Sequence, residues 1–243
     1  PVPSELKWFG AGYLPEWGPA FTGMNNSTLL LGIIAIAVYV IAQIRKYTHS
    51  GDITGKKEAF WPFAVRIGIV AVVIGYATWL FGSGRPGTSF PIPGLILVIL
   101  IILYYLITER TPFGRHVYAV GGNKSAAELS GVNVKRTYFL TMLNMSVLAA
   151  VAGILFVGRS TAAGPADGTS WEMDAIASVF IGGAAVSGGV GTVIATMVGG
   201  LVMAVLNNGL MLMGVGADKT QVIKGFVLLA AVAFDVYNKK NRR

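Results

Sequence analysis

The chain has 243 residues, of which 54% are hydrophobic and only 12% are charged. In soluble domains about a quarter of the residues are charged, so this composition excludes an ordinary soluble domain and indicates an integral membrane protein. The net charge of +8 does not indicate nucleic acid, since the basic residues lie between apolar blocks rather than in one aromatic-interleaved patch. The chain has no Cys, which excludes disulfides, thiolate metal sites and cysteine catalysis.

Seven apolar segments follow one another along the chain. The unbroken run from Leu95 to Ile107 is longer than a buried strand, and a bilayer core of about 30 Å needs about 20 helical residues. The fifth segment is too short for a full span, contains the paired glycines Gly182-Gly183 and is followed by the pair Gly188-Gly189, so we interpret it as a broken or re-entrant helix. The sequence therefore predicts an all-α, polytopic membrane protein with one domain over residues 1–243. The expected crossings are 28–44, 64–81, 93–108, 137–157, 172–186, 191–212 and 219–236.

Lys and Arg alternate in density between the loops. The loops 45–66, 109–136 and 237–243 hold five, five and four of the 19 basic residues, whereas the segments 1–27, 82–92 and 158–171 hold one each. The remaining two, Lys219 and Lys224, open the last crossing. By the positive-inside rule, the segment before the first crossing lies outside and the C-terminus is cytoplasmic. Segment 1–27 is rich in aromatic residues, and we expect an ordered outside loop at the level of the lipid headgroups.

The cytoplasmic loop 109–136 is expected to contain one short helix. Asn123 is a good N-cap, although Ser125 with Glu128 offers a competing capping box. Gly131 suits the C′ position, so the helix is predicted over 124–130. Spacing alone leaves two interpretations open, a surface that docks on a partner and a simple connector. Nucleotide binding is excluded, because Asn123 occupies the place where a P-loop requires Gly.

Two features surround the fifth segment. Thr169 and Glu172 are spaced as a capping box for its helix. Beyond it, small residues recur every four positions, which favours close helix packing; a tight face beside a moving gate is the alternative. The recurring residues are Gly188, Thr192, Thr196, Gly200 and Ala204, with Gly191, Ala195 and Gly199 alongside.

Few ionisable residues lie within the crossings. Arg66, Lys224 and Asp235 are near helix ends, where snorkelling explains them, and the lack of a carboxylate or His relay argues against a proton-driven pump. Neutral polar side chains could bind hydroxyl groups of a sugar, or could form hydrogen bonds between helices. The candidate lining of a translocation path comprises Thr141, Asn144, Ser178, Ser187, Asn207 and Asn208.

Several stretches resemble one transporter family. They are Phe113-Gly114-Arg115-His116-Val117-Tyr118-Ala119-Val120-Gly121-Gly122-Asn123 with Ala126-Ala127, Leu129-Ser130-Gly131 and Val134-Lys135-Arg136; Asp174-Ala175-Ile176-Ala177 through Gly182-Gly183 to Ser187-Gly188-Gly189-Val190-Gly191-Thr192; Val205-Leu206-Asn207-Asn208-Gly209; and Gln221-Val222-Ile223-Lys224-Gly225. The chain resembles the permease subunits of bacterial monosaccharide ABC importers of the ribose/xylose type, akin to branched-chain amino-acid permeases. Its ending, Ala233 to Asn238, looks most like the xylose or multiple-sugar branch.

The resemblance implies a non-enzymatic subunit of the bacterial inner membrane that carries no cofactor. It implies a second permease subunit, forming a homodimer, two cytoplasmic ABC ATPase subunits and an extracytoplasmic sugar-binding protein. Loop 109–136 would then carry the helix that couples the permease to the ATPase. The residues so implied are Gly114, Arg115, Gly121, Gly122, Asn123, Ala126, Ala127, Leu129, Ser130 and Gly131.

The chain departs from this family in its length. Family members have about ten spans, whereas this chain opens Pro-Val-Pro without Met and looks like the C-terminal two-thirds of such a permease. We expect either a fragment or a mis-started gene. Two other functions remain open: a secondary transporter or channel that works without ATP, which predicts an ionisable relay or an inverted repeat, and a membrane scaffold without a transport role.

Overall fold

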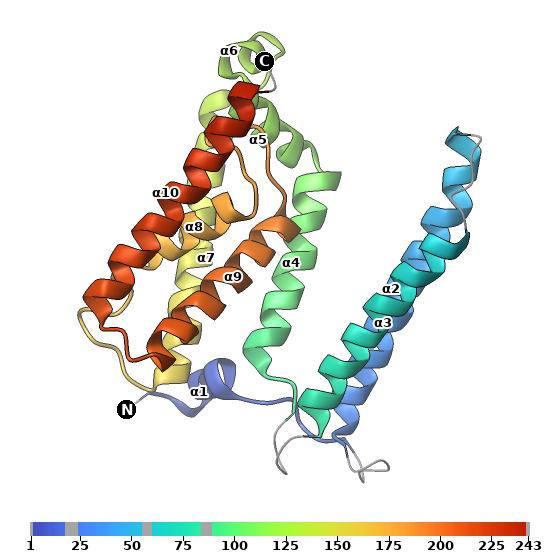
Figure 1. Ribbon diagram of the computed structural model, residues 1–243, viewed down its shortest axis with the longest axis vertical. Coiled ribbons are helices and arrows are strands. Elements are labelled where there is room, and N and C mark those ends of the chain that lie inside the picture. The colour runs from blue at the N-terminus through green and yellow to red at the C-terminus, as the bar shows by residue number, and fades with distance from the viewer. Residues whose placement is uncertain (1, 18–23, 55–59, 84–88, 242–243) are drawn as a thin grey trace. The chain divides into compact units, whose positions relative to one another are not determined.

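The computed structural model describes residues 2–17, 24–54, 60–83 and 89–241. Within these ranges the protein is helical and has no β-strand (Figure 1). Six of the helices are long and apolar enough to cross a membrane, and they match six of the seven expected crossings. The fold class predicted from the sequence is confirmed. The helices are α1 (Ser4–Ala11), α2 (Asn26–Thr54), α3 (Phe60–Gly82), α4 (Ile92–Arg110), α5 (Pro112–Gly122), α6 (Lys124–Leu129), α7 (Val134–Ser160), α8 (Trp171–Ile181), α9 (Val193–Leu212) and α10 (Ala217–Asn241).

The chain forms two compact units. Unit 1 comprises residues 1–96 with 158–161, and unit 2 comprises residues 97–157 with 162–243. In unit 1, α2 and α3 lie side by side as a hairpin (Figure 1). They approach closely at Gly32, where a Cβ would clash with the Thr78 hydroxyl. Helices α2 and α3 continue into the expected basic loop 45–66, of which residues 55–59 lie outside the described part.

The N-terminal segment of unit 1 is ordered where it is described. Helix α1 packs against the end of α7 at Gly10, where a Cβ would clash with the Arg159 backbone. Beyond α1, the Ile92 N–H donates to the Gly12 carbonyl at 3.0 Å, and the Leu14 N–H donates to the Phe90 carbonyl at 3.2 Å. The expected ordered segment is therefore found over residues 2–17, partly as a helix. Residues 18–23 lie outside the described part.

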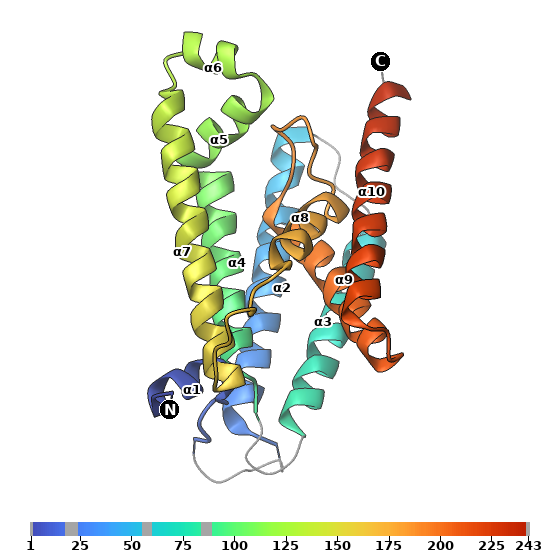
Figure 2. The same cartoon turned by 90° about the vertical axis from the view of Figure 1, so that its left-hand side faces the viewer.

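In unit 2, the short helix α8 packs against α9 and α10 (Figure 2). It has 11 residues, about 16 Å at 1.5 Å per residue, which is about half of the hydrocarbon core. A non-helical turn over residues 182–192 then leads into α9. The interpretation of the fifth segment as a short, broken helix is confirmed.

The predicted capping box of α8 is wrong. Ser170 is the N-cap residue, in the left-handed conformation with φ 68°, and its side chain makes no capping hydrogen bond. The preceding residues form a tight turn instead, in which the Thr169 hydroxyl donates to the Ala166 carbonyl at 2.7 Å. Thr169 is thus engaged in the turn rather than in capping the first N–H groups of α8.

Small residues allow α8 and α9 to pack closely. A Cβ on Gly182 would lie 2.5 Å from the Ala195 carbonyl oxygen, and a Cβ on Gly199 would clash with the Ser178 carbonyl oxygen. Ala177 and Met203 are almost fully buried. The close-packing interpretation is confirmed, because small side chains let helix backbones approach in a membrane. The contact face is formed by Ala195 and Gly199 more than by the four-residue row through Gly188 and Gly200.

Candidate functional site

Loop 109–136 contains two helices rather than one. The first, α5, was not predicted, although Thr111-Pro112 is a start signal that could have revealed it. The Thr111 hydroxyl accepts a hydrogen bond from the Gly114 N–H at 3.3 Å, and Pro112 occupies the first helical position, where its missing N–H is not needed. Gly114 is buried and lies so close to Thr108 that a Cβ there would clash with it, whereas Arg115 is exposed.

The second helix of the loop, α6, is the predicted one. The Asn123 side chain accepts a hydrogen bond from the Ala126 N–H at 3.0 Å, so Asn123 rather than Ser125 is the cap. At the other end, Gly131 has a φ of +84°. Its N–H donates to the Glu128 backbone carbonyl, and the Val132 N–H donates to the Ala127 backbone carbonyl, both at 3.0 Å. This pattern is a Schellman motif, which satisfies the last carbonyls of the helix.

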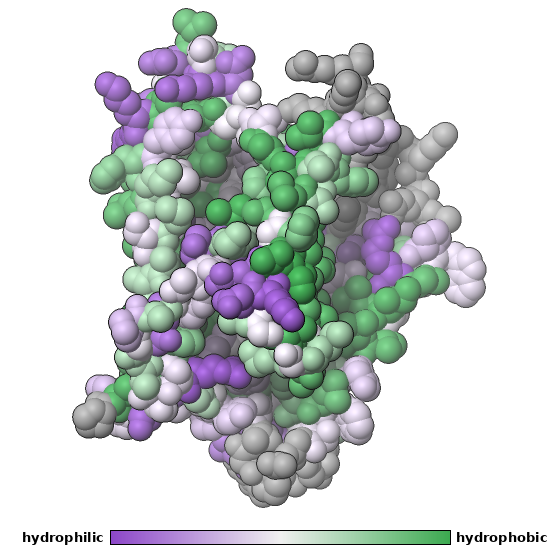
Figure 3. Space-filling view, turned by 60° about the vertical axis from the view of Figure 1, so that its left-hand side comes forward, coloured by the Kyte–Doolittle hydropathy of each residue, from purple (hydrophilic) through white to green (hydrophobic). Residues whose placement is uncertain are grey.

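Helix α6 rests on a small core of its own. Val120, Ala127 and Val134 are only about 5–6% exposed and pack together with Val132. Ala127 therefore stabilises the loop and offers no surface to a partner. Leu129 is 91% exposed, the largest value among the large hydrophobic side chains that the structure describes. Leu129 is the last residue of α6, the helix at one end of unit 2 (Figure 1), and hydrophilic residues gather at that end (Figure 3).

The C-terminal turn of α5 contacts the glycine turn between α8 and α9. A Cβ on Gly121 would lie 2.8 Å from the Gly189 nitrogen, and a Cβ on Gly189 would lie 2.6 Å from the Gly122 Cα. A Cβ on Gly188 would clash with the Gly121 carbonyl oxygen. We call these four residues the glycine junction. Gly188 and Gly189 also have φ values of +83° and +76°, so glycine is required there both for conformation and for space.

A hydrogen bond reinforces the glycine junction. The Tyr118 hydroxyl on α5 donates to the Gly191 carbonyl at 2.7 Å. Burial, and to a smaller extent the Glu109 carboxylate, raises the pKa of Tyr118 above its usual value of about 10. The hydroxyl therefore keeps its proton, and this hydrogen bond, throughout the physiological pH range.

The same glycine turn is held from α10. The Val186 N–H donates to Asp235 Oδ2 at 3.2 Å. Snorkelling is therefore not the role of Asp235, because its carboxylate binds backbone of the turn. The turn between α8 and α9 is thus attached to α5 on one side and to α10 on the other.

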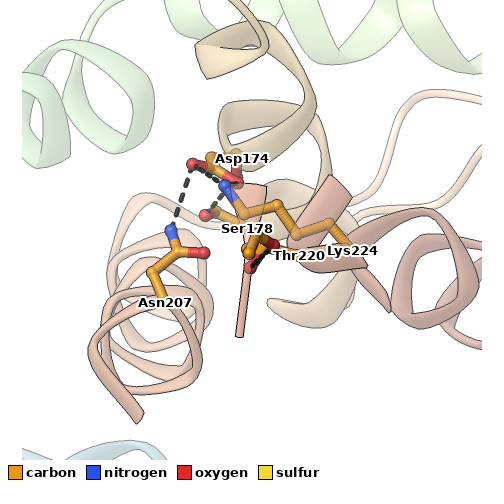
Figure 4. A network of polar contacts seen from close by, with 6 residues as sticks. Asp174, Ser178, Asn207, Thr220 and Lys224 are labelled. Carbon is orange, nitrogen blue, oxygen red and sulfur yellow. Dashed lines mark hydrogen bonds and ion pairs between the residues drawn. The ribbon is translucent and has the colours of Figure 1, made fainter. Parts of the chain in front are cut away.

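A polar network joins α8, α9 and α10 (Figure 4). Lys224 Nζ lies 2.8 Å from Asp174 Oδ1 and 2.9 Å from Asp174 Oδ2. The Asn207 amide donates to Asp174 Oδ2 at 3.1 Å. The interpretation of Lys224 as a snorkelling residue is wrong, because the carboxylate that pairs with it comes from α8, 50 residues away in the sequence.

A cavity of about 480 Å³ lies beside this network. Its polar lining includes Thr169, Ser170, Asp174, Asn207, Gln221 and Lys224, and Trp171 supplies an aromatic surface. A second cavity, of about 460 Å³, is lined mainly by apolar residues of α4 and α9 and also contacts Tyr118. Of these two cavities, the first offers more groups that could bind a polar solute.

The residues predicted to line a path form two groups and two further positions. Ser178 and Asn207 belong to the network around Asp174, where the Ser178 hydroxyl donates to the Asp174 carbonyl. Asn144 on α7 accepts a hydrogen bond from the Tyr104 hydroxyl on α4. Asn144 thus forms a hydrogen bond between helices, which is the alternative to sugar binding. One turn before Asn144, the Thr141 hydroxyl donates to the Thr137 backbone carbonyl of its own helix. Ser187 lies in the glycine turn, and Asn208 is exposed on α9.

Comparison with known proteins identifies relatives of the chain. Residues 9–232 match the model of a family described as branched-chain amino acid transport system / permease component. The xylose transport system permease protein XylH of Haemophilus influenzae is 34% identical over 99% of this chain and 61% of its own length. XylH of Escherichia coli K12 is 33% identical over 99% of this chain and 58% of its own length. The ribose import permease protein RbsC of Bacillus subtilis is 39% identical over 66% of this chain and 49% of its own length.

The chain spans about three fifths of the length of the first of these relatives. No solved structure matches it. The matched region contains all of the glycine junction, the polar network and loop 109–136. The chain therefore belongs to the family of branched-chain amino acid transport system permease components.

Proposed function

We propose that this chain is a permease subunit of an ATP-driven importer for a monosaccharide, either xylose or a related pentose or hexose. Family membership and the names of the relatives support the transport role and the sugar. The observation that carries the coupling to ATP is helix α6, which is capped at both ends, rests on its own core and exposes Leu129. A six-residue helix is marginal in isolation, so such stabilisation suits a docking element.

In this proposal the chain works in a bacterial inner membrane as part of an assembly. Helix α6 contacts a cytoplasmic ABC ATPase subunit, and a second copy of the permease completes the translocation path. An extracytoplasmic sugar-binding protein delivers the substrate. The permease itself performs no covalent chemistry and needs no cofactor, because ATP hydrolysis on the partner drives alternating access.

The contacts around α6 support a direct route for the motion. Because α5 meets the turn between α8 and α9 through backbone atoms of the glycine junction, no flexible side chain absorbs a displacement there. The Tyr118 hydrogen bond and Asp235 hold the same turn. A movement of α6 therefore reaches the short helix α8 and the polar cavity beside it, in addition to the attached helices α4 and α7.

The test replaces Leu129 by Asp. Leu129 and Leu212 are 91% and 89% exposed. They are the last residues of α6 and α9, and α6 and the C-terminal end of α9 lie at opposite ends of unit 2 (Figure 1). We expect Leu129→Asp to abolish co-purification with the ATPase subunit and to lower sugar uptake at least about ten-fold, which is the effect of losing about 1.4 kcal/mol of contact. Leu212→Asp is the matched control and should retain the ATPase. Equal retention by both variants would contradict the assignment of α6. Ala127→Arg is unsuitable, because Ala127 is buried in the loop core.

One observation favours the rival function. Asp174 on α8 and Lys224 on α10 form an ion pair within the membrane region. Ion-coupled transporters use ionisable side chains in such positions. The two functions differ in their energy source. Uptake into vesicles should stop when ATP is withdrawn and persist when the proton and sodium gradients are collapsed; the opposite result would establish the secondary transporter.

A further inference from the structure

The cavity between α8, α9 and α10 has the chemistry of a solute site. We propose that it binds a neutral, polyhydroxylated ring of monosaccharide size, with Asp174, Asn207, Gln221 and Lys224 as hydrogen-bonding groups and Trp171 as the apolar wall. The site rests on the proposed function and locates the substrate within the permease. Its volume of about 480 Å³ falls within the range of about 300–1,000 Å³ that is typical of small-molecule pockets.

The polar groups around the cavity have hydrogen-bonding capacity that the fold leaves unused. Within the described residues, Asn207 Oδ1 is buried and accepts no hydrogen bond. A buried amide oxygen without a partner is costly, and a ligand hydroxyl would satisfy it. The Lys224 ammonium has three N–H groups, and both of its contacts in the described part are to Asp174.

Charge balance selects among the ligand classes. Because Lys224 contacts both oxygens of Asp174, the pair carries no net charge. A charged group of a zwitterionic amino acid would meet a charge that is already neutralised by its partner, and would lie close to the like charge of that partner. A sugar hydroxyl can donate to the carboxylate, or accept from the ammonium, while the pair stays intact, and hydrogen bonds to charged groups are the stronger ones.

The aromatic wall adds a surface for the C–H face of a sugar ring. Trp171 lines the cavity and packs edge-to-face on Phe156, with the ring centroids 4.7 Å apart. Phe156 therefore limits the orientations of the indole. A flat ring beside hydrogen-bonding groups matches the alternation of C–H and O–H groups on a sugar, since aromatic side chains offer a large apolar surface.

Tryptophan fluorescence provides a direct test. Trp171 is the only tryptophan of unit 2, since the other four are Trp8, Trp17, Trp61 and Trp79. In the full chain with those four changed to Phe, titration with D-xylose or D-ribose should change the emission saturably, and L-leucine should not. An equal response to L-leucine, or no saturable response to any of the three, would overturn the proposal.

Gln221 separates ligand binding from helix packing. It lines the cavity, is exposed, and makes no hydrogen bond in the described part of the chain. Gln221→Ala should raise the Kd for labelled xylose about five-fold, the effect of losing one neutral hydrogen bond, in equilibrium dialysis with the otherwise unaltered protein. Gln43 on α2, the only other glutamine, is the matched control, and Gln43→Ala should leave the Kd unchanged. Equal Kd values for all three proteins would overturn the site even if the fluorescent variant fails to fold.

Uptake distinguishes failure of the site from failure of the function. If the assembled transporter imports xylose or ribose with an unchanged KM in Gln221→Ala, the sugar site is wrong while the sugar permease stands. If the transporter imports leucine and neither sugar, the proposed function itself is wrong.

Discussion

At the scale of single residues, the glycine junction depends on two separate requirements. Gly188 and Gly183 have nearly the same conformation, with φ values of +83° and +81°. A Cβ on Gly183 would meet nothing within 4 Å, whereas one on Gly188 would clash with the Gly121 carbonyl oxygen. The two glycines thus share the same conformational strain but differ in contact, which makes them a matched pair for mutation.

We expect Gly188→Ala to be the more damaging of the two substitutions. Gly183→Ala should cost about 1–2 kcal/mol of stability, because a left-handed conformation is unfavourable for a residue with a Cβ. Gly188→Ala should cost clearly more, because it must also push α5 away, and it should lower ATP-driven uptake. Thermal unfolding of the detergent-purified chain, together with uptake, measures both effects. Equal losses of stability in the two variants would show that the close approach at the junction is unimportant.

The polar network shows how a contact with a residue distant in the sequence changes the interpretation of Lys224. Lys224, seen alone near the start of α10, fits snorkelling. In the fold, both of its polar contacts within the described residues are to the Asp174 carboxylate, and breaking such a partly buried pair leaves an uncompensated charge. The role of a membrane lysine is therefore decided by a residue 50 positions away in the sequence.

At the scale of elements, α6 is stabilised mainly by the caps at its two ends and by the small core beneath it. Its six residues provide too few internal hydrogen bonds for stability in water. The Asn123 cap, the Schellman motif at Gly131 and the core around Ala127 supply the rest. Because each end is fixed, the backbone that carries Leu129 is held in place, which suits the proposed docking surface.

Removal of the Asn123 cap should loosen α6. Asn123→Ala should cost about 1 kcal/mol of local stability, increase hydrogen exchange of the amides of residues 126–131, and weaken association with the ATPase. Asn123→Asp keeps a capping oxygen and should restore protection. Ser125→Ala should have no effect, because Ser125 is not the cap. Strong exchange in Ser125→Ala with none in Asn123→Ala would assign the cap to Ser125 instead.

At the scale of the whole molecule, the distribution of basic residues predicts the orientation in the membrane. Loop 109–136 carries five Lys and Arg, whereas segment 158–171 carries one. Because the chain has no Cys, a single introduced Cys reports its own side of the membrane. The exposed positions Ser125 and Ala166 lie in these two segments.

We expect a membrane-impermeant thiol reagent to distinguish the two positions. In intact cells with a permeabilised outer membrane, Ala166→Cys should be labelled and Ser125→Cys should not. In inside-out vesicles the pattern should reverse. Labelling of Ser125→Cys from outside would place α6 away from the cytoplasm and would contradict the proposal that it contacts a cytoplasmic ATPase.

Local signals explain which elements could be predicted from the sequence. The length of the apolar runs predicted the six long helices, because the apolar stretch of a membrane span is contiguous in the sequence. Asn123 and Gly131 predicted α6, because helix capping depends on neighbouring residues. Helix α5 was missed although Thr111-Pro112 marks its start. The capping box at Thr169 was wrong, because the turn before α8 uses the same hydroxyl.

The sequence by itself determined the all-α membrane fold, the short fifth segment and the basic loop with its helix. Only the tertiary structure decided that Gly121 and Gly122 meet Gly188 and Gly189, that Asp174 pairs with Lys224, and that Ala127 is buried while Leu129 is exposed. The physical reason is that helix formation and capping are local, whereas these contacts join residues that only packing brings together.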